Sequence, residues 1–216
     1  MRITALQFHE SEGVDDWRVL AFGACAHFVT GSFSTGVALV GAIGALAGQV
    51  GKDPDVDLRP GHVTVRLLTL EQSGLTEADR ELAVLISRAA RELGVSADPS
   101  AVSDVQFAID VMDLAKVRPF WAAVLGYEEW GEEDVIDPRL RMPSIWFQEM
   151  DEPRTQRNRI HIDVFVPHDQ AEARVAAAVA AGGRVLYDAQ APTWWTLADP
   201  EGNEVDVATW LGRDGF

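Results

Sequence analysis

His161 stands in a segment whose residue types and spacing could carry chemistry. From Ile160 to Val166 the aliphatic residues alternate with His161, Asp163 and Phe165, which is the period-two pattern of a β-strand with two unlike faces. The imidazole is therefore expected on the face away from the aliphatic side chains. A histidine in such a place is either a ligand for a metal or small molecule, or a residue that makes a structural hydrogen bond.

The strand around His161 belongs to a unit that occurs twice. Each copy is predicted as a strand, a helix and further strands, so the second half of the chain is an internal duplication of a βαβββ unit. Gln106 lies seven residues before Asp113, and His161 lies seven residues before His168, so Gln106 and His161 are equivalent. The predicted elements are strands near 105–111, 127–131 and 144–150 around a helix over 113–125, then strands near 161–166, 184–187, 193–197 and 204–208 around a helix over 168–181.

Two motifs within this duplication are similar to those of a known family. They are Phe120-Trp121-Ala122-Ala123-Val124-Leu125-Gly126-Tyr127-Glu128 and Asp199-Pro200-Glu201-Gly202-Asn203-Glu204-Val205-Asp206. With them the chain resembles the glyoxalase/bleomycin-resistance/dioxygenase group, the vicinal-oxygen-chelate superfamily. Asn158-Arg159-Ile160-His161-Ile162-Asp163 resembles its glyoxalase-like subgroup. The resemblance implies a cupped sheet over about 102–210, whose first and last strands supply metal ligands at Gln106, Trp146 or Gln148, His161, and Asp206.

This implied ligand set leaves two interpretations open. His161 and Asp206 are good ligands, Gln106 is a weak oxygen donor, and Trp146 cannot coordinate a metal. One interpretation is a divalent metal ion held by Gln106, His161 and Asp206. The other is a metal-free pocket in which His161 pairs with Asp206. In both, His161 and Asp206 are the candidate catalytic residues, and the candidate ligand-binding residues of this half are Trp121, Trp146, Gln148, Arg159 and Trp194.

The first half predicts an antiparallel sheet with helices on one face. A strand is expected over 19–28, with His27 near its end, and another over 62–69. An apolar helix is expected over 36–50, capped by Ser34 or Thr35 and ended near Pro54. A second helix is expected over 77–93, where Thr76 and Asp79 have the spacing of a capping box. With the duplication, these elements place the whole chain in the α+β class.

The order of these elements, with Asp-Pro-Asp-Val-Asp-Leu-Arg at 53–59 and Gly-Leu-Thr-Glu-Ala-Asp at 74–79, resembles pterin-4a-carbinolamine dehydratase over about 14–94. The resemblance implies a histidine pair before the loop proline and a third histidine after the second strand. This chain has Lys52, Asp53 and Leu70 there. Dehydration of a carbinolamine needs groups that exchange protons near pH 7, and lysine and aspartate have reference pKa values of about 10.4 and 3.9. Only Asp79 stands at a matching acidic position, so we expect a catalytically degenerate site.

The composition of the chain limits the classes of partner that it can be expected to bind. The formal charge of −16 disfavours nucleic acid and anionic lipid. A single cysteine, Cys25, and a start without a signal-peptide pattern indicate a cytoplasmic protein. Residues 20–51 contain no Asp, Glu, Lys or Arg, but the most apolar part is shorter than a bilayer requires, so we expect no membrane span. A helix that is apolar on every side leaves an apolar face exposed unless another chain or domain packs on it. We therefore predict a homodimer.

The joint at 95–100 separates two domains, residues 1–96 and 101–216. Two classes of function remain open for the pair. The chain is either a lyase-type enzyme that acts on a small oxygenated metabolite through His161 and Asp206, or a catalytically silent protein that binds a small molecule. The alternative activity is 4a-hydroxytetrahydrobiopterin dehydration.

Overall fold

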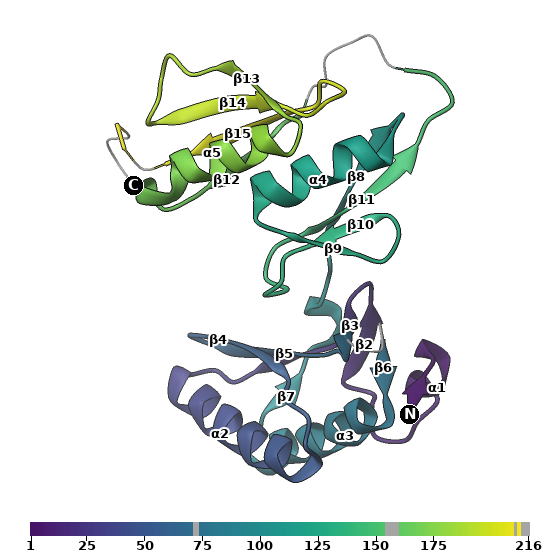
Figure 1. Ribbon diagram of the computed structural model, residues 1–216. Helices are drawn as coiled ribbons and strands as arrows, with labels where there is room; N and C mark the ends of the chain where they lie inside the picture. The colour runs from purple at the N-terminus through teal and green to yellow at the C-terminus, as the bar shows by residue number, and fades with distance from the viewer. Residues whose placement is uncertain (71–73, 154–159, 210, 213–216) are drawn as a thin grey trace. The chain divides into compact units, whose positions relative to one another are not determined.

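The computed structural model describes residues 1–70, 74–153, 160–209 and 211–212. The chain forms two compact units, Met1–Asp104 and Val105–Phe216. The joint therefore lies a few residues beyond the predicted 95–100 segment. Figure 1 shows helices and strands in both units, and the α+β class predicted from the sequence is confirmed.

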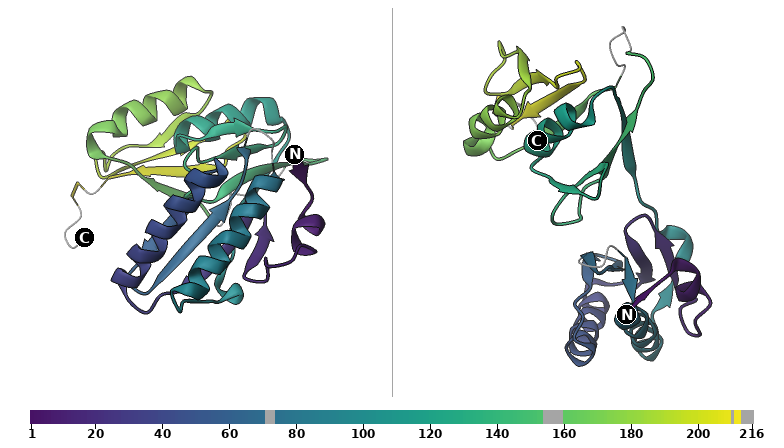
Figure 2. Two further views of the ribbon diagram at one scale, coloured as in Figure 1. Left: turned by 90° about the horizontal axis from the view of Figure 1, so that it is seen from below. Right: turned by 45° about the vertical axis from the view of Figure 1, so that its right-hand side comes forward.

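The first unit is built on an antiparallel sheet in the order β2-β3-β5-β4, with β7 paired to the end of β3. Helices α2 and α3 lie side by side on one face of this sheet, and Figure 2 shows the same arrangement from below. The elements are β1 (Arg2–Ile3), α1 (Ala5–His9), β2 (Trp17–Leu20), β3 (Gly23–Val29), α2 (Phe33–Val50), β4 (Asp55–Arg59), β5 (His62–Leu67), β6 (Leu75–Thr76), α3 (Glu77–Glu92), β7 (Ser96–Ala97) and a 3-10 helix at Pro99–Ala101; β1 pairs with β6.

Two parts of this sheet correct the sequence prediction. The strand predicted over 19–28 is a hairpin of β2 and β3, because Gly23 adopts φ +96° and a Cβ there would meet the carbonyl of Leu67. Residues 55–59, interpreted as part of a loop, form the edge strand β4. Their Asp-Val-Asp-Leu-Arg sequence is itself alternating, with Val56 and Leu58 packed against the core and the charged residues exposed.

Helix α2 packs one face on the sheet through Gly36, Leu39, Ile43 and Ala47. It begins at Phe33, with Ser32 rather than Ser34 or Thr35 as its cap. In length and composition alone α2 could also cross a membrane. Its contacts with α3, β4 and β5 are those of a helix that covers the sheet of its own domain.

The second unit contains two sheets of the same design. Their orders are β8-β11-β10-β9 and β12-β15-β14-β13, and in each the first strand runs parallel to its neighbour while the other pairs are antiparallel. The predicted βαβββ duplication is thereby confirmed, with β10 as a strand that the sequence prediction did not name. The elements are β8 (Gln106–Val111), α4 (Leu114–Leu125), β9 (Glu128–Trp130), β10 (Asp134–Ile136), β11 (Ser144–Glu149), β12 (Ile162–Phe165), a 3-10 helix at His168–Gln170, α5 (Ala171–Ala180), β13 (Arg184–Tyr187), β14 (Trp194–Ala198) and β15 (Glu204–Ala208).

One apolar core holds both modules of this unit together. Phe120, Trp121 and Val124 of α4 are buried in the same cluster as Ala171 and Ala178 of α5, and Val205 and Val207 of β15 join them from the second sheet. The two sheets are therefore fixed relative to each other by their shared helix layer, which lets side chains from both modules line one cavity.

Candidate functional site

His161, Asp163 and Asp206 lie together at one end of the second sheet. Asp163 of β12 and Asp206 of β15 are register partners in a parallel pair, so their side chains lie next to each other on one face. His161 precedes β12 by one residue and, two residues from Asp163, lies on the same face. Its Nε2 is 3.2 Å from Asp163 Oδ1 and 3.9 Å from Asp206 Oδ2.

This His161 cluster offers one imidazole nitrogen and two carboxylate oxygens, all within 4.8 Å of one another. About half of the His161 and Asp163 side chains is exposed, whereas Asp206 is 17% exposed. Such a donor set suits a divalent ion of hard to borderline character and leaves positions open for water or a ligand. The residues present therefore fit a metal ion.

A cavity of about 600 Å³ adjoins His161 and is lined by both modules. Its apolar wall is Phe107, Ile109, Met112, Trp121, Met150, Pro153, Ile160 and Ile162, and its polar lining includes Asp110, His161, Glu201, Asn203 and Glu204. A cavity of this size with an apolar wall and few polar groups is the usual form of a small-molecule site.

The Asp-Pro-Glu-Gly-Asn turn builds one wall of this cavity. Asp199 is buried and accepts hydrogen bonds from the backbone N–H groups of residues 201–203 and from Trp121 Nε1 at 3.1 Å. The Glu201 carboxylate accepts the backbone N–H groups of Met112 and Asp113 at 2.8 and 2.7 Å. The turn in the second module thus fixes both Trp121 and the start of α4 in the first.

The other predicted ligand-binding residues of this unit are more dispersed. The Gln106 amide donates to Asp134 Oδ1 at 3.2 Å, and Gln106 is not among the residues that line the cavity in the described part of the chain. Burial, and then the nearby Glu133, raise the pKa of this partner, Asp134. Trp146 is half-buried and Gln148 exposed on β11, and Trp194 stacks on Tyr187 with ring centroids 6.4 Å apart. Arg159 lies outside the described residues.

Asp163 is a cluster member that the sequence prediction did not include. Its signal was present in the alternation of 160–166, because residues two apart on a strand share a face. The prediction followed the family positions alone and so took His161 and Asp206 without the carboxylate between them.

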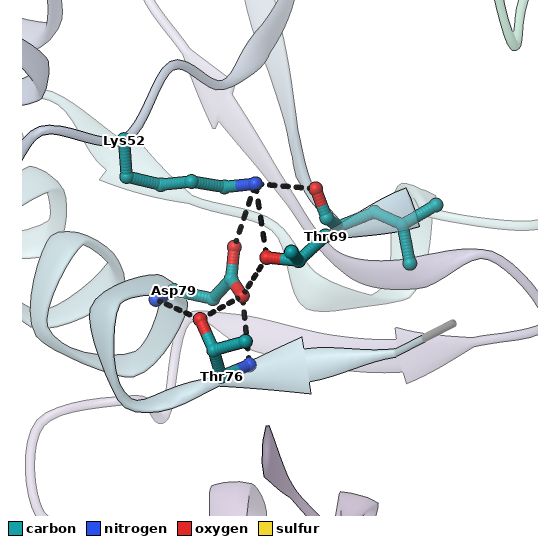
Figure 3. Close-up of polar contacts among 5 residues, drawn as sticks. Lys52, Thr69, Thr76 and Asp79 are labelled. Atoms are coloured by element: carbon teal, nitrogen blue, oxygen red, sulfur yellow. Dashed lines mark hydrogen bonds and ion pairs between the residues drawn. The ribbon is translucent and has the colours of Figure 1, made fainter. Parts of the chain in front are cut away.

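In the first unit, Lys52 and Asp79 form a buried ion pair at the position of the degenerate site (Figure 3). Asp79 is fully buried, and its Oδ2 accepts hydrogen bonds from Thr69 Oγ1, Thr76 Oγ1 and the Thr76 backbone N–H, at 2.7–2.8 Å. Among the residues that the structure describes, no donor forms a hydrogen bond to Asp79 Oδ1, which lies 3.3 Å from Lys52 Nζ. The Lys52 ammonium also donates to the Leu68 carbonyl and to Thr69 Oγ1.

The polar groups of Lys52 and Asp79 are used in structural contacts inside the first domain. The Lys52 ammonium donates to the Leu68 carbonyl and Thr69 Oγ1 and pairs with the Asp79 carboxylate. Asp79 forms the capping box of α3 that its sequence position predicted, since its carboxylate accepts the Thr76 N–H and its own N–H donates to Thr76 Oγ1. Asp53 and Leu70, which stand at the other implied histidine positions, are exposed. The arrangement explains Asp79 as a structural carboxylate.

Comparisons with known proteins divide the chain in the same way. The family model described as "Pterin 4 alpha carbinolamine dehydratase" matches residues 3–89, and the model described as "Glyoxalase-like domain" matches residues 106–208. No curated protein matches the chain. The two family matches confirm both resemblances predicted from the sequence.

Three solved structures illustrate the likeness, each over part of the chain. A transcriptional coactivator/pterin dehydratase from Brucella melitensis is 22% identical over 42% of this chain and 99% of its own, with a TM-score of 0.39. A glyoxalase/bleomycin resistance protein from Albidiferax ferrireducens T118 is 20% identical over 48% of this chain and 95% of its own, with a TM-score of 0.39. The fosfomycin resistance protein FosX from Mesorhizobium loti is 10% identical over 49% of this chain and 90% of its own, also with a TM-score of 0.39.

Proposed function

Because this chain joins a pterin-4a-carbinolamine dehydratase-like domain to a glyoxalase-like domain, we propose that it takes a small oxygenated molecule in the cavity of its glyoxalase-like domain. A divalent metal ion held by His161, Asp163 and Asp206 is part of this proposal. The observation that carries it is the cluster of three ligand groups within 4.8 Å at the edge of a 600 Å³ cavity.

Each group of the site has a distinct task in this proposal. His161 presents Nε2 toward both carboxylates, and those carboxylates supply the negative charge that a cation requires. A divalent ion bound there would polarise an oxygen atom of the small molecule. Trp121, fixed through its Nε1 by Asp199, provides a rigid apolar wall against a flat ligand.

The proposal covers a lyase-type enzyme and a metabolite-binding protein, because both need the same cavity and the same cluster. Only the lyase-type enzyme would convert the bound molecule into a product, so a measurement of turnover distinguishes the two. A lyase-type enzyme needs His161 or one of its carboxylate partners to move a proton of the bound molecule. A binder needs only the fixed wall and the polar contacts.

Manganese titration of the untagged protein tests the cluster. We expect His161→Ala and Asp206→Asn each to weaken Mn²⁺ binding at least about tenfold, because each removes one of three ligands. The matched controls are His168→Ala and Asp169→Asn, which remove the same groups from the exposed 3-10 helix. Equal affinity in the site and control variants would contradict the metal proposal and leave the metal-free binder.

For the first domain, we propose that the pterin site is catalytically silent. The groups that remain, Lys52 and Asp79, are engaged with each other and with Thr69 and Thr76, which leaves neither placed to exchange a proton with a substrate. With 4a-hydroxytetrahydrobiopterin as substrate, we expect dehydration at the uncatalysed rate. Turnover above that rate, lost in Asp79→Asn, would establish the alternative dehydratase activity.

We also propose that the protein is a cytoplasmic homodimer joined through the exposed face of α2. Val37, Gly41, Gly44 and Gly48 lie on that face, and the three glycines have open space around them.

Burial raises the pKa of the Cys25 thiol to about 11, so the single cysteine stays protonated and needs no oxidising compartment.

A further inference from the structure

His27 and His62 lie on the face of the first sheet that α2 and α3 leave uncovered. On β3 the neighbours Ala26 and Phe28 point into the core, and on β5 Val63 does the same. His27 and His62 therefore point to the opposite face, where both are partly exposed. Neither belongs to the His161 cluster or to the network around Asp79.

The two imidazole rings are close enough to bind one ion. Their centroids are 4.6 Å apart and their planes are tilted by 36°. The two nitrogen ligands of a tetrahedral zinc ion, each about 2.0–2.1 Å from the metal, lie about 3.3 Å apart, a spacing that rings in contact can reach. We propose that His27 and His62 form a two-histidine site for a divalent transition-metal ion such as Zn²⁺, Ni²⁺ or Cu²⁺.

Thr64 prepares one of the rings for this role. His27 Nδ1 lies 2.9 Å from Thr64 Oγ1, and the two residues are register partners on β3 and β5. When Nδ1–H donates to that hydroxyl, the lone pair is on Nε2, the arrangement common to metal-binding histidines. Thr64 is in this sense a positioning residue.

The surroundings of His27 favour its neutral imidazole. Burial, and then the nearby His62, lower the pKa of His27, while Asp98 acts in the opposite direction. Four other charged groups of this face form ion pairs, Asp57 with Arg59 at 2.9 Å and Arg66 with Asp104 at 2.6 Å. Asp55 and Arg18 lie on the same face, as register partners of Arg66 and Cys25. Since metals bind the neutral ring, the lowered pKa keeps His27 available to a metal ion down to a lower pH than a free histidine would be.

The test uses the full-length, untagged protein with His161→Ala, which removes the imidazole of the His161 cluster. Calorimetric titration with Ni²⁺ or Zn²⁺ should show one remaining site. We expect His27→Gln and His62→Gln each to weaken that site at least about tenfold, and Thr64→Val to weaken it less than either. His168→Ala is the matched control and should leave the affinity unchanged.

Nitrogen-15 NMR of the imidazoles gives a second readout that does not depend on affinity. Zinc should shift the ring-nitrogen resonances of His27 and His62 together, at equal stoichiometry. Equal affinity in the His161→Ala parent and the His27→Gln/His62→Gln variant, or ring resonances unmoved by zinc, would overturn the proposal. Because the manganese experiment addresses the carboxylate-rich cluster, either site can fail without the other.

Discussion

Lys52 shows how a single residue can give a buried carboxylate a structural role. The Asp79 side chain is fully buried, and the desolvation of such a carboxylate costs several kcal/mol unless a cation and hydrogen bonds compensate. Lys52, 17% exposed, provides the cation, and Thr69 and Thr76 provide the hydrogen bonds. The pair therefore stabilises the fold only while both partners are present.

The first prediction concerns this pair. Lys52→Met removes the cation that faces the buried Asp79 carboxyl, so we expect the free energy of unfolding to fall by about 3 kcal/mol, toward the lower end for a broken buried pair because Lys52 retains some exposure. Urea denaturation followed by circular dichroism measures it. Lys52→Met/Asp79→Asn should recover part of the loss.

Lys116→Met is the matched control for Lys52→Met, because Lys116 forms an ion pair with Asp113 at an exposed position. Its urea midpoint should not change measurably. If Lys52→Met also leaves the midpoint unchanged, Asp79 does not depend on Lys52 as its counter-ion.

Single residues were predictable where the cause is local. The Asp79 capping role follows from its distance to Thr76 and is found in the structure. The contact between Lys52 and Asp79 joins the end of α2 to the start of α3 through the end of β5, so it depends on tertiary packing that no sequence window contains. The hydrogen bond from the Gln106 amide to Asp134 was unpredictable for a similar reason, since Asp134 comes from the unpredicted strand β10.

At the scale of elements, periodicity predicted the strands and helices with a clear face and missed the short connections. The hairpin between β2 and β3 depends on Gly23, whose positive φ turns a continuous apolar run into two strands. The strand β4 was not predicted because Pro54 was interpreted only as the signal that ends α2, whereas it also lies just before a strand. An apolar run thus shows that residues are buried and leaves the turn within it undetermined.

The second prediction concerns the exposed face of α2. Its buried face includes Ala47, and Val40 also packs against the core. A substitution that tests the dimer therefore belongs at Val37 or Ala45, which are exposed. Val37→Glu and Ala45→Glu would place charge in the proposed contact between two α2 helices, and we expect each to convert the proposed dimer to a monomer in light scattering, with little change in the melting temperature.

Arg88→Glu is the control for the α2 variants, because it introduces the same side chain on the exposed face of α3. It should leave the dimer intact. A wild-type protein that is monomeric at every concentration would show that the uncharged face of α2 is not a contact between copies.

At the scale of the whole molecule, the two domains have separate cores and a joint near residue 104. The sequence placed the end of the first domain at residue 96, where small residues and a proline mark a linker. The structure adds interactions beyond that point. β7 pairs with β3, the Asp98 backbone N–H donates to the His27 carbonyl, and Asp104 binds Arg66 and accepts the Phe22 backbone N–H.

The last prediction follows from these interactions. A fragment of residues 1–104 should fold alone, and a fragment of residues 1–96 should be less stable, because it loses the Asp104 contact to the partly buried Arg66 and the β7 pairing of Ala97 with Phe28. Hydrogen bonds to charged groups contribute about 1.5–3 kcal/mol each, and 1 kcal/mol corresponds to roughly 4–8 °C in a domain of this size. We therefore expect the melting temperature of 1–96 to be at least about 6 °C lower in calorimetry, with Asp104→Asn in 1–104 between the two. If 1–104 and 1–96 melt together, the segment after residue 96 is only a linker; if neither folds, the first core depends on the rest of the chain.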